Sequence, residues 1–294
     1  MAQSPAHQFG QMIGDVLEAA IEPILKQFAE EHGLFFDKKG PRPVRSGNKL
    51  CWTDLNQNKH ELDFVLERGG TPSKQGVPVA FIETAWRRYT KHSRNKAQEI
   101  QGAIIPLLET YSKQRPFIGA VLAGVFTEGA LSQLKSLGFA VAYFPYEKII
   151  NTFQVVGIDA AFDETTPDAK LARKMALWNR LSSPAKAKVF HSLIVFNRGE
   201  LDQFMAALKQ SIERKIKSIR IVPLHGSAVE WRTLDEAVAF VKNYNEGPST
   251  FTLIRYEVQV LFLNGDKVVG EFGARADALA FLESFRISSA KAQP

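Results

Sequence analysis

Two continuous apolar segments separated by a short helical pattern constrain the fold of this chain more than any other feature. Residues 117–126 and 139–144 are almost entirely apolar, which is typical of strands covered on both faces of a sheet. Between them, a pattern that begins at Thr127 and ends at Gly138 predicts a helix. A strand, a helix and a second strand in this order predict a parallel pair joined by a right-handed crossover. The chain is therefore expected to build an α/β fold.

The residues before this unit add helices and further strands. Apolar residues recur at helical spacing over residues 8–32, and a second helix is predicted from about Ser93 to Ser112. A basic segment broken by glycine and proline, residues 37–49, is expected to be a loop. The strands are expected at residues 50–55 and 61–66, forming a hairpin, and at residues 77–82. This order predicts a mixed central sheet flanked by helices, in a domain of residues 1–163.

The remaining residues, 164–294, are expected to form a helical linker followed by a smaller α+β module. Helices are predicted at residues 168–182 and 198–217. The module is read from a faint internal repeat, in which residues 219–244 and 258–285 each combine two short strands with a helix. The turns of the two hairpins are expected at His225-Gly226 and Asn264-Gly265. We therefore expect a duplicated ββα accessory domain with one antiparallel sheet.

Composition excludes several classes of protein. The single cysteine, Cys51, excludes an internal disulfide and a cysteine-based zinc site. No apolar run is long enough to span a bilayer, and no signal peptide is visible at the N-terminus, so a cytoplasmic protein without a membrane partner is expected. The formal net charge of +6 permits an anionic partner such as nucleic acid without requiring one.

Two acids stand at strand positions where carboxylates are uncommon. Asp63 interrupts an apolar strand, and Glu83 ends the next one. On neighbouring strands the two would repel each other unless a cation lay between them, and Mg²⁺ is commonly held by one or two carboxylates. The alternative is a structural ion pair with Arg87, Arg88 or a lysine.

This arrangement resembles the PD-(D/E)XK nuclease superfamily, which has the restriction-endonuclease fold. Asp63 matches the motif aspartate, and Glu83 matches the motif acid. The sequence departs from the motif at Ala85, where the family has lysine. The family is known to place that lysine on the following helix, which makes Lys96 the first candidate and Lys91 the second. The resemblance thus implies catalytic residues Asp63, Glu83 and Lys96, with Mg²⁺ bound by the two acids.

The resemblance also implies contacts around this centre. The family often carries an acid on its first helix, which Glu18 matches loosely, with Glu22 as the rival and a solvated helix acid as the alternative. A run of cations follows Glu83 and suits the phosphates of double-stranded DNA. The predicted DNA-binding residues are Arg87, Arg88, Lys91 and Arg94.

The resemblance implies a Mg²⁺-dependent DNA endonuclease that hydrolyses phosphodiester bonds in double-stranded DNA, most similar to a sequence-specific type II restriction enzyme. A cut in both strands needs two active sites, so a homodimer is expected. Two alternatives stay open. One is a non-cleaving DNA-binding or regulatory relative of the nuclease fold, which Ala85 favours. The other is a structural protein in which the acids are simply paired.

Overall fold

The computed structural model describes residues 4–112, 114–213, 215–223, 226–247, 255–263 and 265–290. The chain divides into two compact units, Met1–Leu208 and Lys209–Pro294. The boundary that we expected near residue 163 therefore lies earlier than the division in the structure. The reason is that two helices after residue 163, Asp168–Arg180 and Ser183–Phe196, pack against the first helix of the chain and so belong to the first unit.

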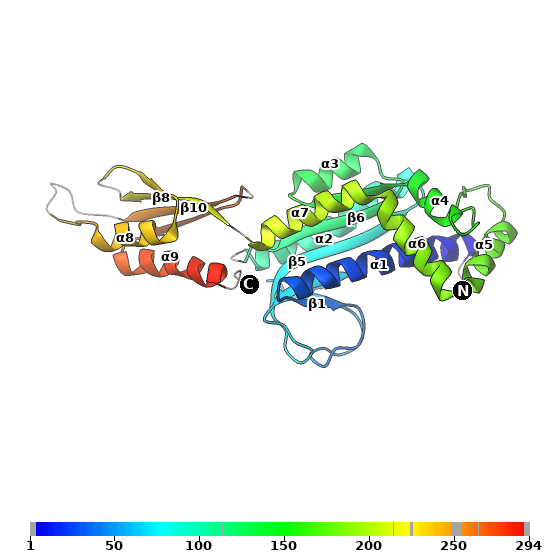
Figure 1. The fold of residues 1–294 in the computed structure, drawn as a ribbon, viewed down its shortest axis with the longest axis horizontal. Helices are drawn as coiled ribbons and strands as arrows, with labels where there is room; N and C mark the ends of the chain where they lie inside the picture. Colours follow the sequence, from blue (N-terminus) through cyan, green and yellow to red (C-terminus); the bar gives the residue numbers. More distant parts are fainter. Residues whose placement is uncertain are drawn as a thin grey trace. The chain divides into compact units, whose positions relative to one another are not determined.

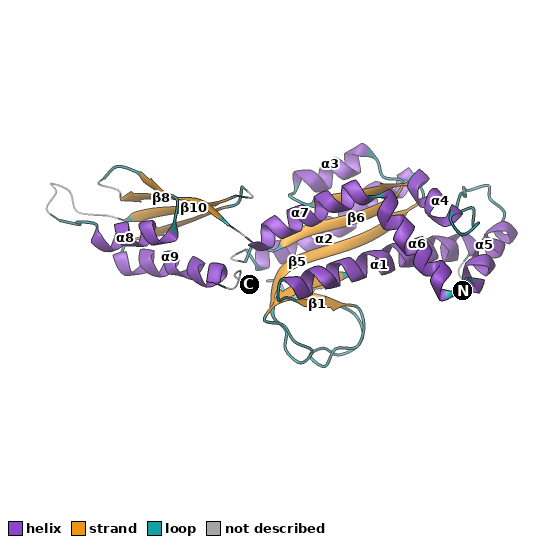
Figure 2. Ribbon diagram, viewed as in Figure 1, coloured by secondary structure: helices purple, strands orange, loops and turns teal. Residues whose placement is uncertain are grey.

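The first unit is built on a five-stranded sheet with the strand order β1-β4-β5-β6-β7. Its elements as far as the start of α7 are α1 (Pro5–Glu31), β1 (Phe35–Lys38), β2 (Cys51–Thr53), β3 (Lys59–Glu61), β4 (Phe64–Arg68), β5 (Val77–Arg87), the 3₁₀ helix η1 (Thr90–His92), α2 (Ser93–Thr110), β6 (Phe117–Gly124), α3 (Glu128–Ser136), β7 (Ala140–Pro145), α4 (Tyr146–Gln154), α5 (Asp168–Arg180), α6 (Ser183–Phe196) and α7 (Arg198–Glu213). Strands β1, β4 and β5 are antiparallel neighbours, whereas β5, β6 and β7 run parallel. The expected mixed α/β sheet flanked by helices is confirmed (Figures 1 and 2).

Helices cover both faces of this sheet, and every residue of β6 is buried. On one face, α2 and α3 pack with alternate residues of β5 and β6 in a single hydrophobic cluster. On the other face, α1 lies against β5 and α7 lies against β6. Gly119 of β6 permits this second approach, because a Cβ there would stand 2.6 Å from Cζ of Phe204. The continuous apolar run in the sequence thus has its cause in a strand with helices on both sides.

The strands near Asp63 differ from the prediction. The expected hairpin divides at Leu62–Asp63: β2 and β3 form a separate two-stranded ribbon, and β4 joins the main sheet between β1 and β5. Strand β1 lies partly in the segment that was expected to be a loop, and Asp37 in it pairs with Val65 of β4. A four-residue edge strand has too few residues for an alternating pattern to be visible in the sequence.

A buried ion network joins the loop after β1 to the loop between β4 and β5. The guanidinium of Arg42 is 2.5 Å from Asp37 and 2.5 Å from Glu67, and it also donates to backbone carbonyls of the second loop. Arg45 adds a bond of 2.7 Å to Asp37. Arg42 is 6% exposed and Glu67 is fully buried, so each charge depends on its partners for compensation.

The second unit contains a four-stranded antiparallel sheet with the order β11-β10-β8-β9. Its elements are β8 (Ile216–Pro223), β9 (Val229–Trp231), α8 (Leu234–Asn243), β10 (Tyr256–Phe262), β11 (Lys267–Phe272) and α9 (Arg275–Ala290). Alternate residues of β10 are buried in a core that includes residues of α8 and α9. The expected turn residues His225 and Asn264 lie outside the described residues.

Candidate active site

Strands β4 and β5 separate at the point where Asp63 and Glu83 lie. Phe64 is paired with Ile82 across the two strands, and beyond this pair β5 continues to Arg87 beside β6 alone. The chain before Phe64 turns away into β3. Asp63 and Glu83 are therefore next to the last paired residues, Phe64 and Ile82, at the point where the two strands separate. We call this point the fork. Two acids that are far apart in sequence meet at an open edge of β5.

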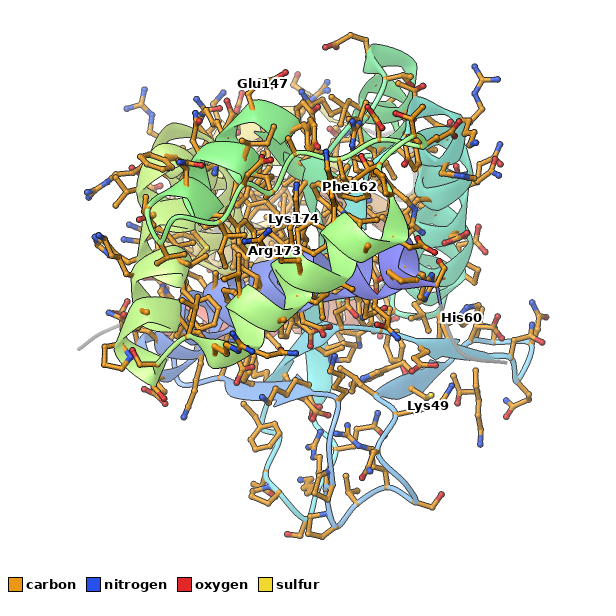
Figure 3. All side chains as sticks on the ribbon, turned by 90° about the vertical axis from the view of Figure 1, so that its right-hand side faces the viewer. Lys49, His60, Glu147, Phe162, Arg173 and Lys174 are labelled. Atoms are coloured by element: carbon orange, nitrogen blue, oxygen red, sulfur yellow. The ribbon has the colours of Figure 1, made fainter. Side chains whose placement is uncertain are left out.

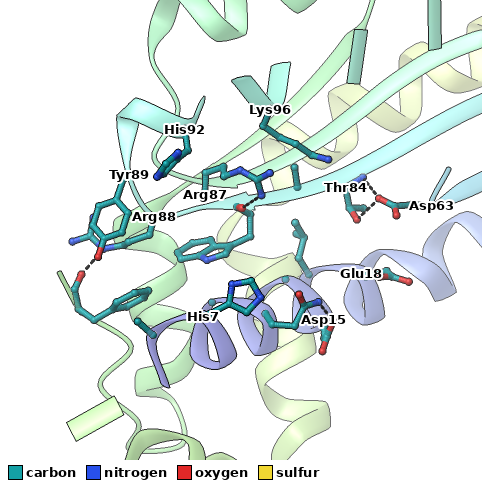
Figure 4. A pocket seen from close by; sticks show the side chains of 18 of the residues that line it. His7, Asp15, Glu18, Asp63, Thr84, Arg87, Arg88, Tyr89, His92 and Lys96 are labelled. Carbon is teal, nitrogen blue, oxygen red and sulfur yellow. Dashed lines mark hydrogen bonds between the residues drawn. The ribbon is translucent and has the colours of Figure 1, made fainter. Parts of the chain in front are cut away.

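Hydrogen bonds connect the two acids through the backbone between them. The Asp63 N–H donates to Glu83 Oε1 at 3.2 Å. Asp63 Oδ2 accepts from the Thr84 N–H at 2.8 Å and from the Thr84 hydroxyl at 2.9 Å (Figure 4). Asp63 Oδ1 and Glu83 Oε2 accept no hydrogen bond from the described residues. Within the same residues, neither carboxylate forms an ion pair, so the structural pairing considered as an alternative is not observed there.

The electrostatics of Glu83 are unusual for a carboxylate. Its side chain lies in the interior, with the residue only 6% exposed. Burial raises the pKa of Glu83 to about 8, and the nearby charge of Asp63 acts in the same direction. The ammonium of Lys96 and the N–H of Asp63 oppose this shift without cancelling it. Glu83 is therefore mostly protonated at neutral pH, and a cation placed between the two acids would favour its ionised form.

The position of the motif lysine is taken by a residue of the hydrophobic core. Ala85 is 5% exposed and packs in the cluster that joins β5 to α2. Lys96, in the first turn of α2, lines the same cavity as Asp63 and extends over β5 towards it (Figure 4). Lys96 Nζ is also 3.4 Å from Glu99, and Lys91 places its Nζ 2.6 Å from Glu164, where both side chains are exposed. Of the two lysines, Lys96 is the one beside the acids, and its catalytic role stays a prediction.

A cavity of about 490 Å³ runs from Asp63 along the open edge of β5. Residues 84–89 form one side of it, and the first half of α1 forms the other. Gly10 and Gly14 stand one helical turn apart on α1 and face Trp86, and a Cβ on Gly10 would make an ordinary van der Waals contact of 3.6 Å with Trp86 Nε1.

The acids of α1 divide between the cavity and the surface. Glu18 lines the cavity, and its Oε2 is 2.7 Å from Nζ of Lys39. Glu22 does not line it and pairs with Lys38 at 2.6 Å.

Sequence reasoning missed Lys39 and Thr84 as site residues. Lys39 lies in a segment read only as a basic loop, and the contact of Thr84 with Asp63 depends on how the two strands separate.

Arg88 is held in an aromatic environment at the far end of the cavity. Its Nε donates to the carbonyl oxygen of Phe162, and its guanidinium carbon lies 4.1 Å from the ring centre of Tyr146. These contacts fix the segment after α4 against the end of β5. Arg88 thus has a structural partner in addition to the phosphate-binding role that was predicted for it.

The other predicted DNA-binding cations differ in whether they are free. Arg87 has its Nη2 3.5 Å from Glu99, and Lys91 is bonded to Glu164 as described above. Arg94 is exposed and makes no ion pair with the described residues. Phosphate binding by Arg87 or Lys91 would have to replace an existing ion pair, so the basic run offers less free charge than its sequence indicates.

The described residues contain neither a cluster of metal ligands nor a helix that could cross a membrane. No group of three or more His, Cys, Asp or Glu side chains there is arranged to hold a metal ion. A magnesium ion would consequently depend on the two carboxylates at the fork, with water and phosphate completing its ligands. None of the described helices has both the length and the apolar character needed to cross a membrane.

Comparisons with known proteins add little to this description. No family model matches the sequence, and no curated protein matches it either. A structural match is a crystal structure described as a protein of unknown function, AF1548, at 12% sequence identity and a TM-score of 0.26. The match covers 61% of this chain and 98% of the other. Likeness at this level carries no argument about fold family or function.

Proposed function

We propose that this chain is a Mg²⁺-dependent DNA endonuclease that hydrolyses phosphodiester bonds in double-stranded DNA, most similar to a type II restriction enzyme. One observation carries the proposal: Asp63 and Glu83 meet at an open strand edge without an ion pair to any described residue, beside Lys96. The ionised form of a buried acid is destabilised by a second acid nearby, and a bound cation would stabilise that form. The arrangement therefore fits a cation-binding centre better than a structural salt bridge.

The donor atoms at the fork fit magnesium. Asp63 and Glu83 each have a carboxylate oxygen without a hydrogen bond from the described residues, and carboxylate oxygens are preferred ligands of Mg²⁺. These two residues would hold the ion. When bound, the ion supplies Lewis acidity towards a phosphoryl oxygen and lowers the pKa of a coordinated water molecule.

The protein side chains position the other participants. Thr84 fixes the carboxylate of Asp63 through two hydrogen bonds to Oδ2, so Oδ1 has no hydrogen bond from the described residues. Lys96 brings a positive charge to the cavity, where it can hydrogen-bond a phosphate oxygen and neutralise the charge that develops during attack. The first half of α1 limits the approach to the open edge of β5, so the substrate strand has to enter along the cavity.

The test is cleavage of plasmid DNA with Mg²⁺ and with EDTA. Wild-type protein should cut with Mg²⁺ only, and Asp63→Ala or Glu83→Ala should abolish cutting while leaving DNA binding largely intact. Glu109→Gln, which removes an exposed carboxylate on α2, is the matched control and should cut like wild type. Cutting that survives both changes at the fork would refute this site.

A second candidate function is a non-cleaving DNA-binding relative of the nuclease fold. The observation that favours it is Ala85, which is buried in the core where the motif lysine is expected. Salt-sensitive DNA binding with no cleavage in Mg²⁺ or Mn²⁺ would select this candidate.

A homodimer is expected for the first candidate, the endonuclease, since two sites are needed for a double-strand cut. Sedimentation with and without duplex DNA tests it.

A further inference from the structure

One segment that the catalytic site does not include carries a net positive charge as large as that of the whole chain. Between Asp168 and Arg198 there are seven Lys or Arg residues and one acid, a formal charge of +6. The whole chain has 37 basic and 31 acidic residues, which is also +6. The rest of the sequence therefore contains 30 of each and is neutral. The segment corresponds to α5, α6 and the first residue of α7.

Three of these cations form a stripe on α5, which we call the α5 stripe: Lys170, Arg173 and Arg180. All three are exposed, and none makes an ion pair with a described residue. Their spacing of three and seven residues places them on one face of the helix. The opposite face is apolar, and its Leu171 and Trp178 are 1% and 8% exposed. Packing of that face turns the cations of the stripe towards solvent.

Helix α5, which carries the stripe on its exposed face, lies close to one end of the cavity. Helix α5 packs against α1, which is one wall of the cavity. Lys174, on the inner side of α5, donates to the carbonyl oxygen of Ala161 and is 3.2 Å from Asp159. The neighbouring Phe162 lines the cavity, and Figure 3 shows it close to Lys174, in agreement with the bond between Lys174 and Ala161. An extended ligand that leaves the cavity at this end would reach α5 next.

We propose that the α5 stripe binds the phosphate backbone of the same DNA that enters the cavity, and so extends the substrate track beyond the site of cleavage. This rests on the proposed function for the choice of DNA as the polyanion. Lys170 and Arg180 are ten residues apart, so the stripe is about 15 Å long, enough for a few successive phosphates of one strand. Such binding needs cations that are not already in ion pairs. The stripe provides three of them, whereas Arg87, Arg88 and Lys91 in the run after Glu83 already have partners.

An anionic membrane surface is the competing partner for a basic helix. Membrane-surface helices expose a broad apolar face that enters the lipid. On α5 the large apolar residues face inward, and Leu177, at 42% exposed, is the single large apolar side chain that the helix presents to solvent in the described structure. The chemistry of the stripe therefore favours a hydrated polyanion over a lipid bilayer.

The experiment measures how the affinity for a duplex of about 20 base pairs depends on salt, in EDTA so that no cleavage occurs. Each phosphate contact contributes about 0.9 to the slope of log affinity against log salt concentration. The variant Lys170→Gln/Arg173→Gln/Arg180→Gln should lower that slope by about 2 to 3. The control Lys26→Gln/Lys59→Gln/Lys135→Gln removes the same charge from exposed positions of α1, β3 and α3, and should change it by less than about 1.

The variant Arg173→Lys/Arg180→Lys keeps the charge and should retain the wild-type slope, which separates charge from helix stability. Equal slopes for the stripe variant and the control overturn the proposal, as does a wild-type protein that binds no duplex. Loss of binding to phosphatidylserine vesicles with unchanged DNA binding also overturns it, in favour of a membrane. Absence of Mg²⁺-dependent cutting with a lowered slope leaves the stripe standing and removes the nuclease activity alone.

Discussion

Replacing Glu83 by glutamine tests the electrostatics of the fork without needing any activity. Glutamine keeps the size of the side chain and keeps an oxygen that can accept the hydrogen bond from the Asp63 N–H. It removes the ability to ionise. The wild-type carboxyl is buried next to a second acid, so its charged form is disfavoured in the folded protein. The change therefore isolates the free energy of keeping a charge at this position.

The magnitude follows from the pKa of Glu83, which is raised from its ordinary value of 4.5 to about 8 by burial and by the charge of Asp63. The folded state thus binds the proton more tightly than the unfolded state. The resulting stability is fully present below pH 4.5 and is lost as the pH rises through 8. At about 1.4 kcal/mol for each pKa unit, the total loss is about 5 kcal/mol.

The assay is urea unfolding between about pH 4.5 and pH 9 in EDTA, followed by tryptophan fluorescence. Three of the four tryptophans lie in the first unit, so the signal reports mainly on it. Near pH 9, Glu83→Gln should be more stable than wild type by several kcal/mol, and near pH 4.5 the two should agree within about 1 kcal/mol. The exposed control Glu109→Gln should follow wild type at every pH. Parallel curves for Glu83→Gln and wild type would refute the reasoning.

Three further predictions concern proton release at the fork, the lysine beside it and the buried ion network of Arg42. Because Glu83 is mostly protonated at pH 7, Mg²⁺ binding should release up to about one proton per ion, measured by calorimetry in buffers of different ionisation enthalpy; binding without release by wild type contradicts the site. Lys96→Ala should reduce cleavage by about 10² to 10⁴, while Lys91→Ala should leave it nearly unchanged; the opposite order in a plasmid assay means that the wrong lysine was chosen. Arg42→Ala leaves two buried carboxylates without their main partner and should lower the free energy of unfolding by about 3 to 5 kcal/mol, whereas Arg45→Ala should cost less; equal effects in urea unfolding would show that the network is not centred on Arg42.

The parts of the fold that were predicted correctly are those fixed by local patterns. The parallel pair β6 and β7 with α3 between them follows from apolar runs and a helix cap in one stretch of chain. The strands around Asp63 were not predicted correctly, because their partners are distant in sequence. Phe64 lies between Lys38 of β1 and Ile82 of β5, and no local pattern records that β3 and β4 belong to different sheets.

The candidate site shows the same division between local and distant information. Asp63 and Glu83 stand out in the sequence because acids are rare in apolar strands, and the structure brings them to one fork. The sequence did not show which of the neighbouring cations are already paired in the folded protein. Lys91 pairs with Glu164, which is 73 residues further along the chain, and only the tertiary fold brings two such residues together.

Charge in a sequence becomes binding capacity only where the fold leaves it unpaired and exposed. The run after Glu83 looks like the basic region of this chain when residues are read in order, yet Arg87, Arg88 and Lys91 have partners in the folded protein. The α5 stripe is less conspicuous in the sequence, because mainly apolar residues separate its cations. Packing of α5 on its neighbouring helices buries Leu171 and Trp178 and leaves the cations of the stripe on one exposed face. If DNA follows the cavity, its affinity should therefore depend more on α5 than on the residues beside the catalytic acids.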